Sequence, residues 1–151
     1  MLPGIGMAAK GKILVVEDND DCRYLLTLII KAFGYEVFEA ATGLAALDQA
    51  GATHPDLILM DLGLPGISGD EATARLKANP STSHIPVLIH TAFHEGEQTN
   101  RALAAGAARI LHKPIDARKL LAVLQQYMPA DEGPRVVAQE APAICQPPSL
   151  P

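Results

Sequence analysis

Five short apolar runs alternate along the chain with longer segments that have the apolar spacing of helices. Three runs are nearly continuous stretches of Ile, Leu and Val, at residues 12–17, 56–60 and 85–90, and two weaker runs lie at 35–39 and 109–112. Continuous rather than alternating apolarity is typical of strands buried on both faces, as in a parallel sheet covered by helices. A strand followed each time by a helix predicts an α/β fold with right-handed crossovers.

The segments between these runs are expected to be helices. The first begins after Asn19 or Asp20, either of which can cap it, and Gly34 ends it. Its predicted buried stripe has four positions on one face: Cys22, Leu25 or Leu26, Ile29 and Phe33. Further helices are expected at residues 44–50, 70–78, 97–105 and 116–127.

The two ends of the chain lack this alternation. Residues 1–9 are short and contain glycine, and residues 129–151 are rich in Pro and Ala. We expect both segments to be flexible, because neither can bury enough apolar surface to offset the entropy of ordering it. The 151-residue chain is therefore interpreted as one domain over residues 10–128, with no output domain of its own.

Charge, cysteine content and hydropathy exclude several classes of protein. The formal net charge of −5 disfavours sequence-independent binding to nucleic acid, which needs a basic face. Cys22 and Cys145 form neither a disulfide framework nor a zinc spacing, so a reducing cytoplasm is the simplest compartment, and Cys22 is expected to be a small buried residue. No apolar run approaches the roughly 20 residues of a membrane helix, so no membrane partner is expected.

Acidic side chains follow two of the predicted strands at the points where they end. Glu17 and Asp18 follow the first strand, and Asp61 follows the third. Sites in open parallel sheets form at the carboxyl ends of strands, so the three carboxylates converge if these strands are neighbours. Their repulsion would be relieved by a hard cation such as Mg2+, which favours oxygen ligands. Each acid alone could be a helix cap, but three together indicate a site.

The fourth and fifth strands end in two further polar residues. Lys113 can act as a point charge for a phosphoryl oxygen or for the carboxylate of Asp61. A single lysine is more often solvated, but Pro114 fixes the chain where Lys113 leaves its strand and favours a defined position. Thr91 is either an ordinary β-branched strand residue or a hydroxyl with room, beside the small Ala92, to meet an incoming oxygen.

Four segments together resemble the receiver domain of two-component response regulators. They occur in the order and at the spacing of that family: VVEDN at 15–19, LILMDLGLPGISG at 57–69, PVLIHTA at 86–92 and GAARILHKPI at 106–115. The resemblance covers residues 10–128. It implies a flavodoxin-like, doubly wound (βα)5 fold with a five-stranded parallel sheet in the order 2-1-3-4-5.

The resemblance also implies a role for each residue at the strand ends. Asp61 would accept a phosphoryl group from a histidine kinase or histidine phosphotransfer protein, and Thr91 and Lys113 would contact the phosphoryl oxygens. The Mg2+ ligands besides Asp61 would be Asp18 directly, Glu17 through water and the backbone carbonyl of Gly63. Such a domain is a switch rather than an enzyme, at most phosphorylating itself and slowly removing its own phosphoryl group.

The chain departs from the family three residues before the lysine. The family usually has an aromatic residue there, where this chain has Ile110. The resemblance still implies phosphoryl acceptance. It does not imply the usual coupling between the threonine and an aromatic ring, because Ile110 has no ring. The two positions that tune the access of water to the acyl phosphate in this family are Gly63 and Phe93.

Two histidines lie beside the candidate site residues in the sequence. His90 and His112 each precede one of them by one position. Strand alternation turns both away from the residues they precede, so we expect a structural role with satisfied hydrogen bonds, or a surface role, rather than metal binding.

Three functions remain to be compared. The first is a phosphoacceptor that signals through contacts with an unknown downstream protein or by relay, without binding nucleic acid directly. The second is a receiver-like docking module that works without phosphorylation; such modules usually lack one of the acids or the lysine, and this chain has them all. The third is a flavodoxin-like redox protein, which is disfavoured because the acidic loop EDNDDC repels phosphate in the absence of a metal.

Overall fold

The computed structural model describes residues 9–94 and 96–128. Five strands form one parallel sheet in the order β2-β1-β3-β4-β5. The strands are β1 (Lys12–Val16), β2 (Glu36–Ala40), β3 (Leu57–Met60), β4 (Val87–Thr91) and β5 (Arg109–His112). Each is followed by a helix: α1 (Asp20–Ala32), α2 (Gly43–Thr53), α3 (Gly69–Ala78), α4 (Glu97–Ala104) and α5 (Ala117–Tyr127). The predicted doubly wound fold and its strand order are confirmed.

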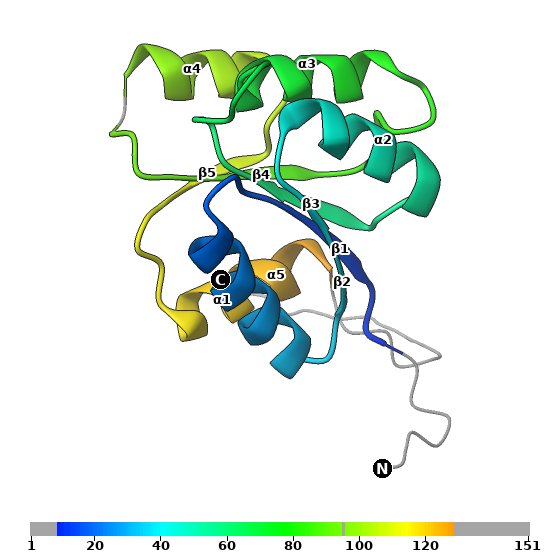
Figure 1. The fold of residues 1–151 in the computed structure, drawn as a ribbon, viewed down its shortest axis with the longest axis vertical. Helices are drawn as coiled ribbons and strands as arrows, with labels where there is room; N and C mark the ends of the chain where they lie inside the picture. Colours follow the sequence, from blue (N-terminus) through cyan, green and yellow to red (C-terminus); the bar gives the residue numbers. More distant parts are fainter. Residues whose placement is uncertain (1–8, 95, 129–151) are drawn as a thin grey trace, which may run out of the picture.

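Helices cover both faces of the sheet, α1 and α5 on one and α2, α3 and α4 on the other (Figure 1). Every residue of β3 and β4 is consequently buried. The edge strands β2 and β5 keep exposed positions, which is why their apolar runs in the sequence are weaker. The strand bounds differ from the predicted ones by one or two residues at some ends, as at β2 and β4.

Alternation along the strands divides the apolar side chains into two cores. Leu14, Ile58 and Ile89 belong to the core on the side of α2, α3 and α4. The core on the side of α1 and α5 contains Ile13, Leu57 and Leu88 from the same strands, together with Leu120 and Leu124 of α5. Continuous Ile, Leu and Val runs are therefore required, because each strand has to supply both layers.

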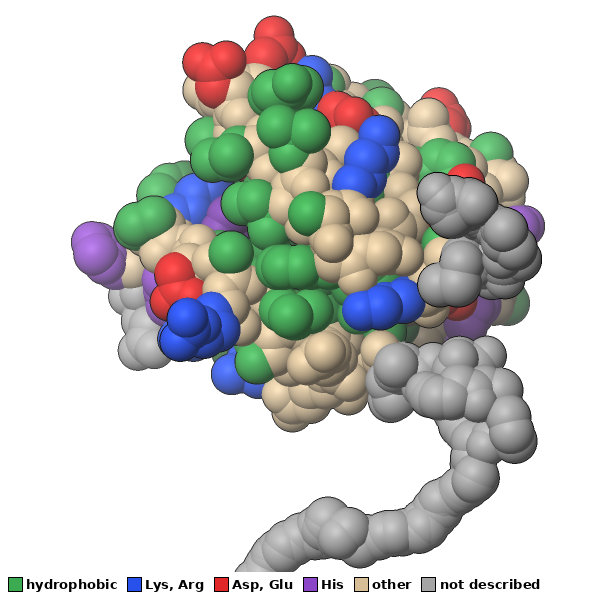
Figure 2. All heavy atoms as spheres, turned by 90° about the horizontal axis from the view of Figure 1, so that it is seen from below, with side chains coloured by type: hydrophobic (Ala, Val, Ile, Leu, Met, Phe, Trp, Pro, Cys, Tyr) green, Lys and Arg blue, Asp and Glu red, His purple; other side chains and the backbone are tan. Residues whose placement is uncertain are grey.

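The buried face of α1 follows most of the predicted stripe: Leu26 is buried, and Ile29 and Phe33 are half-buried against the core on the side of α1 and α5. The helix buries Leu26, Thr27 and Ile30, while Cys22 and Leu25 are exposed. The prediction that Cys22 is buried was wrong, because Asn19 caps the helix at the Cys22 N–H and so places Cys22 in its exposed first turn. Three other apolar side chains of α1 are also exposed, on a side of the molecule where hydrophobic side chains gather (Figure 2): Tyr24, Leu25 and Leu28.

The predicted flexible ends, residues 1–8 and 129–151, lie outside the described residues; residue 9 immediately precedes the folded part. Within the described residues, no helix combines the length and the apolar character needed to cross a bilayer.

Candidate functional site

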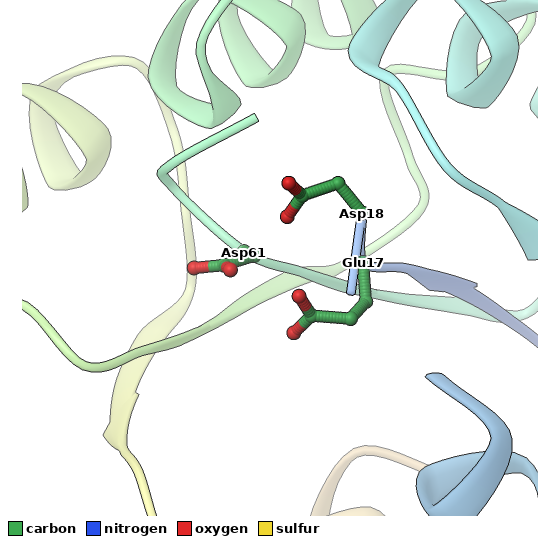
Figure 3. Close-up of side chains that lie close together, drawn as sticks. All are labelled: Glu17, Asp18 and Asp61. Carbon is green, nitrogen blue, oxygen red and sulfur yellow. The ribbon is translucent and has the colours of Figure 1, made fainter. Parts of the chain in front are cut away.

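The strand register brings the acids of two strands together. Val16 pairs with Met60, so the residues that follow, Glu17 and Asp61, emerge side by side at the carboxyl edge of the sheet. The backbone N–H of Asp61 donates to the carbonyl of Val16 at 3.0 Å, which holds the two strand ends together. Asp18 lies beside them, and carboxylate oxygens of the three residues lie within 4.8 Å of one another (Figure 3).

Lys113 reaches this cluster from the end of β5. Its Nζ donates to Oε1 of Glu17 at 2.6 Å and to Oδ2 of Asp61 at 3.1 Å. Its side chain is mostly buried, as are the two carboxylates. One ammonium thus bridges two of the three acids, which relieves part of their mutual repulsion.

Burial and hydrogen bonding oppose each other at these groups. Burial raises the pKa of Glu17, against the hydrogen bonds from Lys113 and from the Asn19 N–H that favour the carboxylate. Burial acts to lower the pKa of Lys113, but the hydrogen bonds to Glu17 and Asp61 outweigh it, so the pKa of Lys113 is raised. The lysine is therefore held in its charged form at the site.

The Asp61 carboxylate is fixed at both oxygens. Oδ1 accepts the backbone N–H of Leu62 at 2.8 Å, and Oδ2 accepts Lys113. The loop after Asp61 then folds back, and the N–H of Gly69 donates to the carbonyl of Leu62 at 3.0 Å. A Cβ on Gly69 would overlap the carbonyl oxygen of Asp61, so this first residue of α3 has to be glycine.

Thr91 ends β4 and is buried. Its hydroxyl accepts the backbone N–H of Phe93 at 3.1 Å, and its carbonyl accepts the N–H of Lys113 at 2.9 Å. Among the described residues, its hydroxyl has no hydrogen bond to the acids. Thr91 is linked to the site through the backbone of Lys113.

Gly63 and Phe93 lie next to each other. A Cβ on Gly63 would stand 3.5 Å from the ring of Phe93, which is exposed. The two positions that the sequence associates with water access therefore belong to one contact. Ile110 is partly buried and packs against the core beneath α2, α3 and α4.

The two histidines differ in their surroundings. His112 is exposed, and its Nδ1 lies 3.2 Å from the carbonyl oxygen of Phe93. His90 is only 6% exposed, and neither of its ring nitrogens has a hydrogen-bond partner among the described residues. The expectation of a satisfied histidine was wrong for His90, because its side of β4 faces an apolar layer. Burial, with the nearby charge of Lys113, lowers the pKa of His90 to about 4.

Sequence reasoning missed Arg23. Its guanidinium donates to the carbonyl oxygen of Glu17 at 2.8 Å, besides two carboxylates. The available signal was an arginine in the first turns of a helix that directly follows an acidic loop, three residues after Asp20.

A family model described as the response regulator receiver domain matches residues 13–125. The chain belongs to this family. Phosphoryl acceptance in two-component signalling is therefore its function, as the sequence predicted.

Individual relatives of the receiver domain agree. The polar-differentiation response regulator DivK of Brucella ovis is 39% identical over 116 residues, which cover 77% of this chain and 94% of that protein. The chemotaxis response regulator CheY4 of Vibrio cholerae has 30% identity and a TM-score of 0.73, over 80% of this chain and 98% of that one. The receiver domain of a sensor histidine kinase from Pseudomonas aeruginosa has 31% identity and a TM-score of 0.75 over the same shares, with a magnesium ion coordinated in its active site cleft.

Proposed function

We propose that this receiver domain accepts a phosphoryl group on Asp61 from the phosphohistidine of a histidine kinase or phosphotransfer protein, with Mg2+ bound by the neighbouring acids. The observation that supports this most directly is the double hydrogen bond of Lys113 to Glu17 and Asp61, beside the carboxylate of Asp18. It unites a nucleophile, a cation for the phosphoryl oxygens and a set of metal ligands at one strand edge.

Asp61 is proposed as the nucleophile. Its hydrogen bonds to Leu62 and Lys113 hold the carboxylate in one orientation. In the transfer, the bond between phosphorus and the donor imidazole nitrogen breaks, and a bond forms between phosphorus and a carboxylate oxygen of Asp61. Such reactions depend mainly on positioning and on neutralising the charge of the equatorial oxygens.

Lys113 and Thr91 are proposed to meet those oxygens. The ammonium of Lys113 already lies within hydrogen-bond distance of Oδ2 of Asp61, so it stands beside the position where the phosphoryl group would be attached. The Thr91 hydroxyl accepts a hydrogen bond from Phe93, which leaves its own hydrogen available for donation to a phosphoryl oxygen.

The donor set fits Mg2+, because three carboxylates offer hard oxygen ligands within 4.8 Å of one another. Asp18 and Asp61 would bind the ion directly, with the backbone carbonyl of Gly63. Both Glu17 oxygens already accept hydrogen bonds, from Lys113 and from the N–H of Asn19, which suits a contact through water. When bound, the ion would neutralise carboxylate and phosphoryl charge.

Receiver domains act as phosphoacceptor switches rather than as enzymes with turnover. For this chain we propose self-phosphorylation from small donors such as acetyl phosphate, slow self-dephosphorylation, and output through contacts with a downstream protein.

The test is labelling with acetyl phosphate and Mg2+, followed by intact mass measurement. The parent should gain one phosphoryl group, and Asp61→Asn should gain none while keeping its circular dichroism spectrum. Asp48→Asn, at an exposed acid of α2, is the matched control and should be labelled like the parent. Stoichiometric labelling of Asp61→Asn would refute the assignment, and an unlabelled parent would favour the docking module that works without phosphorylation.

A further inference from the structure

Arg23 connects three parts of the chain around the acidic loop. Its Nη1 donates to the carbonyl oxygen of Glu17 at 2.8 Å, its Nη2 to Oδ1 of Asp20 at 2.7 Å, and its Nε to Oε1 of Glu39 at 3.1 Å. These acceptors belong to the end of β1, the first turn of α1 and the end of β2. We call this set of contacts the Arg23 clamp.

The contact with the Glu17 carbonyl orients the acidic loop. The Glu17 carbonyl is part of the peptide unit that joins Glu17 to Asp18, so its orientation helps to determine where both carboxylates point. The loop is restrained by other hydrogen bonds as well: the N–H of Asn19 and the Nζ of Lys113 donate to the Glu17 carboxylate, and the N–H of Cys22 donates to the Asn19 side chain. Among these contacts, Arg23 alone holds the Glu17 carbonyl.

The clamp leaves the carboxylates of the site free. Arg23 donates to the backbone carbonyl of Glu17 and to the carboxylates of Asp20 and Glu39, and to no carboxylate of the acid cluster. The two carboxylates also compensate the guanidinium charge, which would otherwise repel a divalent cation. The arrangement is therefore suited to orienting the loop without occupying its ligand oxygens.

The other arginine ion pairs of the described helices are different. Arg75 with Glu71 and Arg101 with Glu97 are exposed pairs one turn apart, a kind that contributes little to stability. The Arg23 side chain is 18% exposed and has three acceptors. The use of three donors of one side chain, one of them on the acidic loop, points to a function of Arg23 at this loop.

We propose that Arg23 is a positioning residue for Mg2+ binding, and hence for phosphoryl acceptance: it fixes the peptide unit between Glu17 and Asp18 so that both acids face Asp61. This inference rests on the proposed function of the Asp61 site. Its effect runs against simple electrostatics, since removal of a positive charge near an acid cluster should by itself strengthen the binding of a cation.

The experiment compares Arg23→Met with Arg23→Lys and with the control Arg75→Met. Mg2+ is titrated against each protein, with backbone amide shifts in NMR spectra as the readout of binding, and labelling by acetyl phosphate is measured over the same Mg2+ series. Arg23→Met should need about tenfold more Mg2+ for half-saturation, the change expected for loss of one charge-assisted hydrogen bond. Its labelling rate at saturating Mg2+ should stay within about twofold of the parent's, because a loop held by the ion no longer needs the clamp.

The variants distinguish a positioning role of Arg23 from an effect of its charge and from a loss of the folded structure. Arg23→Lys, which keeps one donor and the charge, should recover part of the affinity, and Arg75→Met should titrate like the parent. An Arg23→Met protein that binds Mg2+ as tightly as the parent, or more tightly, overturns the proposal. If Arg23→Met fails to fold, Arg23→Gln takes its place: it also removes the positive charge, so a severalfold weaker affinity supports the clamp, and an unchanged or tighter one overturns it. Amide shifts report binding whether or not Asp61 is labelled, so a failure of phosphoryl acceptance is distinguishable from a failure of the clamp.

Discussion

The acid cluster and the surroundings of His90 treat buried polar groups differently, although Lys113 contributes to both. At the cluster its ammonium donates to Glu17 and Asp61, and each of these carboxylates also accepts a backbone N–H. His90 has no hydrogen-bond partner among the described residues. His90 and Lys113 border a cavity of about 180 Å3 whose other walls are mainly apolar: Cys22, Leu25, Leu26, Ile29, Pro114 and Ile115.

The difference shows that burial of polar groups has opposite consequences in the two regions. Around the acids, each buried group has a partner, so removal of one partner leaves another unpaired. The imidazole of His90 has no hydrogen-bond partner among the described residues, so replacing it by an apolar side chain removes an unfavourable contribution to the free energy of folding. Substitutions at the acid cluster and at His90 should therefore change stability with opposite signs.

The largest effect is expected at Lys113 itself. Lys113→Met leaves Glu17 and Asp61 without their shared cation and should lower the free energy of unfolding by about 3 kcal/mol in metal-free buffer. Urea unfolding followed by circular dichroism measures this, with Lys119→Met at an exposed position of α5 as the control. Mg2+ should restore part of the loss, since it supplies positive charge to the same acids. A Lys113→Met protein as stable as the parent would show that the acids do not depend on the lysine.

The opposite sign is expected at His90. His90→Leu should raise the free energy of unfolding by about 1–3 kcal/mol at pH 7.5, the usual penalty of an unpaired buried polar group. The difference in the free energy of unfolding between His90→Leu and the parent should grow below pH 6.5 by about 1.4 kcal/mol per pH unit. In that range the histidine of the unfolded parent binds a proton, whereas the folded one, with its pKa of about 4, does not. The parent thus loses stability as the pH falls, and the variant lacks this loss.

Urea unfolding of both proteins between pH 7.5 and pH 5 checks the slope. Lys113 and Asp61 are the charged neighbours of His90, and both are present in parent and variant, so the difference between the two curves isolates the imidazole. His84→Leu, at an exposed histidine, is the control. The difference between its free energy of unfolding and that of the parent should not grow as the pH falls. A His90→Leu protein less stable than its parent would mean that the imidazole is paired in solution.

A smaller effect is expected at Asp18. Asp18→Asn removes one of three converging negative charges, so the melting temperature in metal-free buffer should be unchanged or higher, by at most about 1 kcal/mol in free energy. The same variant should bind Mg2+ more weakly, because it loses a ligand. Differential scanning calorimetry with and without Mg2+ tests both statements. A clear drop in the metal-free melting temperature would contradict the repulsion among the acids.

The smallest effect is expected on the face around Ile110. Beryllofluoride, a phosphoryl mimic, should shift the amide resonances of Phe93, His94 and Gly96 more than those of β5 and α5. Ile110 has no ring and no polar tip, so a movement of Thr91 toward a phosphoryl group should change the position and solvation of Ile110 only slightly. Ile110→Tyr should enlarge the response of β5. Equally large shifts across β5 and α5 in the parent would show that Ile110 does transmit the change.

The fold and the convergence of the acids could be predicted because both follow from short-range patterns. Continuous apolar runs indicate strands that supply two cores, and the strand-end rule then unites residues as distant in sequence as Glu17 and Lys113. The buried face of α1 was predicted only in part, because apolar residues occupy several of its faces. Leu25 and Leu26 were equally plausible, and Ile30, which is fully buried, was not among the predicted positions.

Two features of the site depend on contacts that no local pattern encodes. The orientation of His90 follows from strand alternation, but its lack of a partner depends on which side chains α1 and the residues after β5 bring beside it. The Arg23 clamp depends on Glu39, which lies 16 residues away at the end of an edge strand. Only the packing of α1 against the sheet places these two side chains together.

The close approach of Gly69 to Asp61 has a consequence for how such a chain can diverge. Because any side chain at position 69 would overlap the Asp61 carbonyl, substitution of Gly69 is excluded while the loop after Asp61 keeps this shape. The exposed Tyr24, Leu25 and Leu28 of α1 meet no comparable obstacle. The surface of α1 can therefore change its side chains while the loop after Asp61 stays the same.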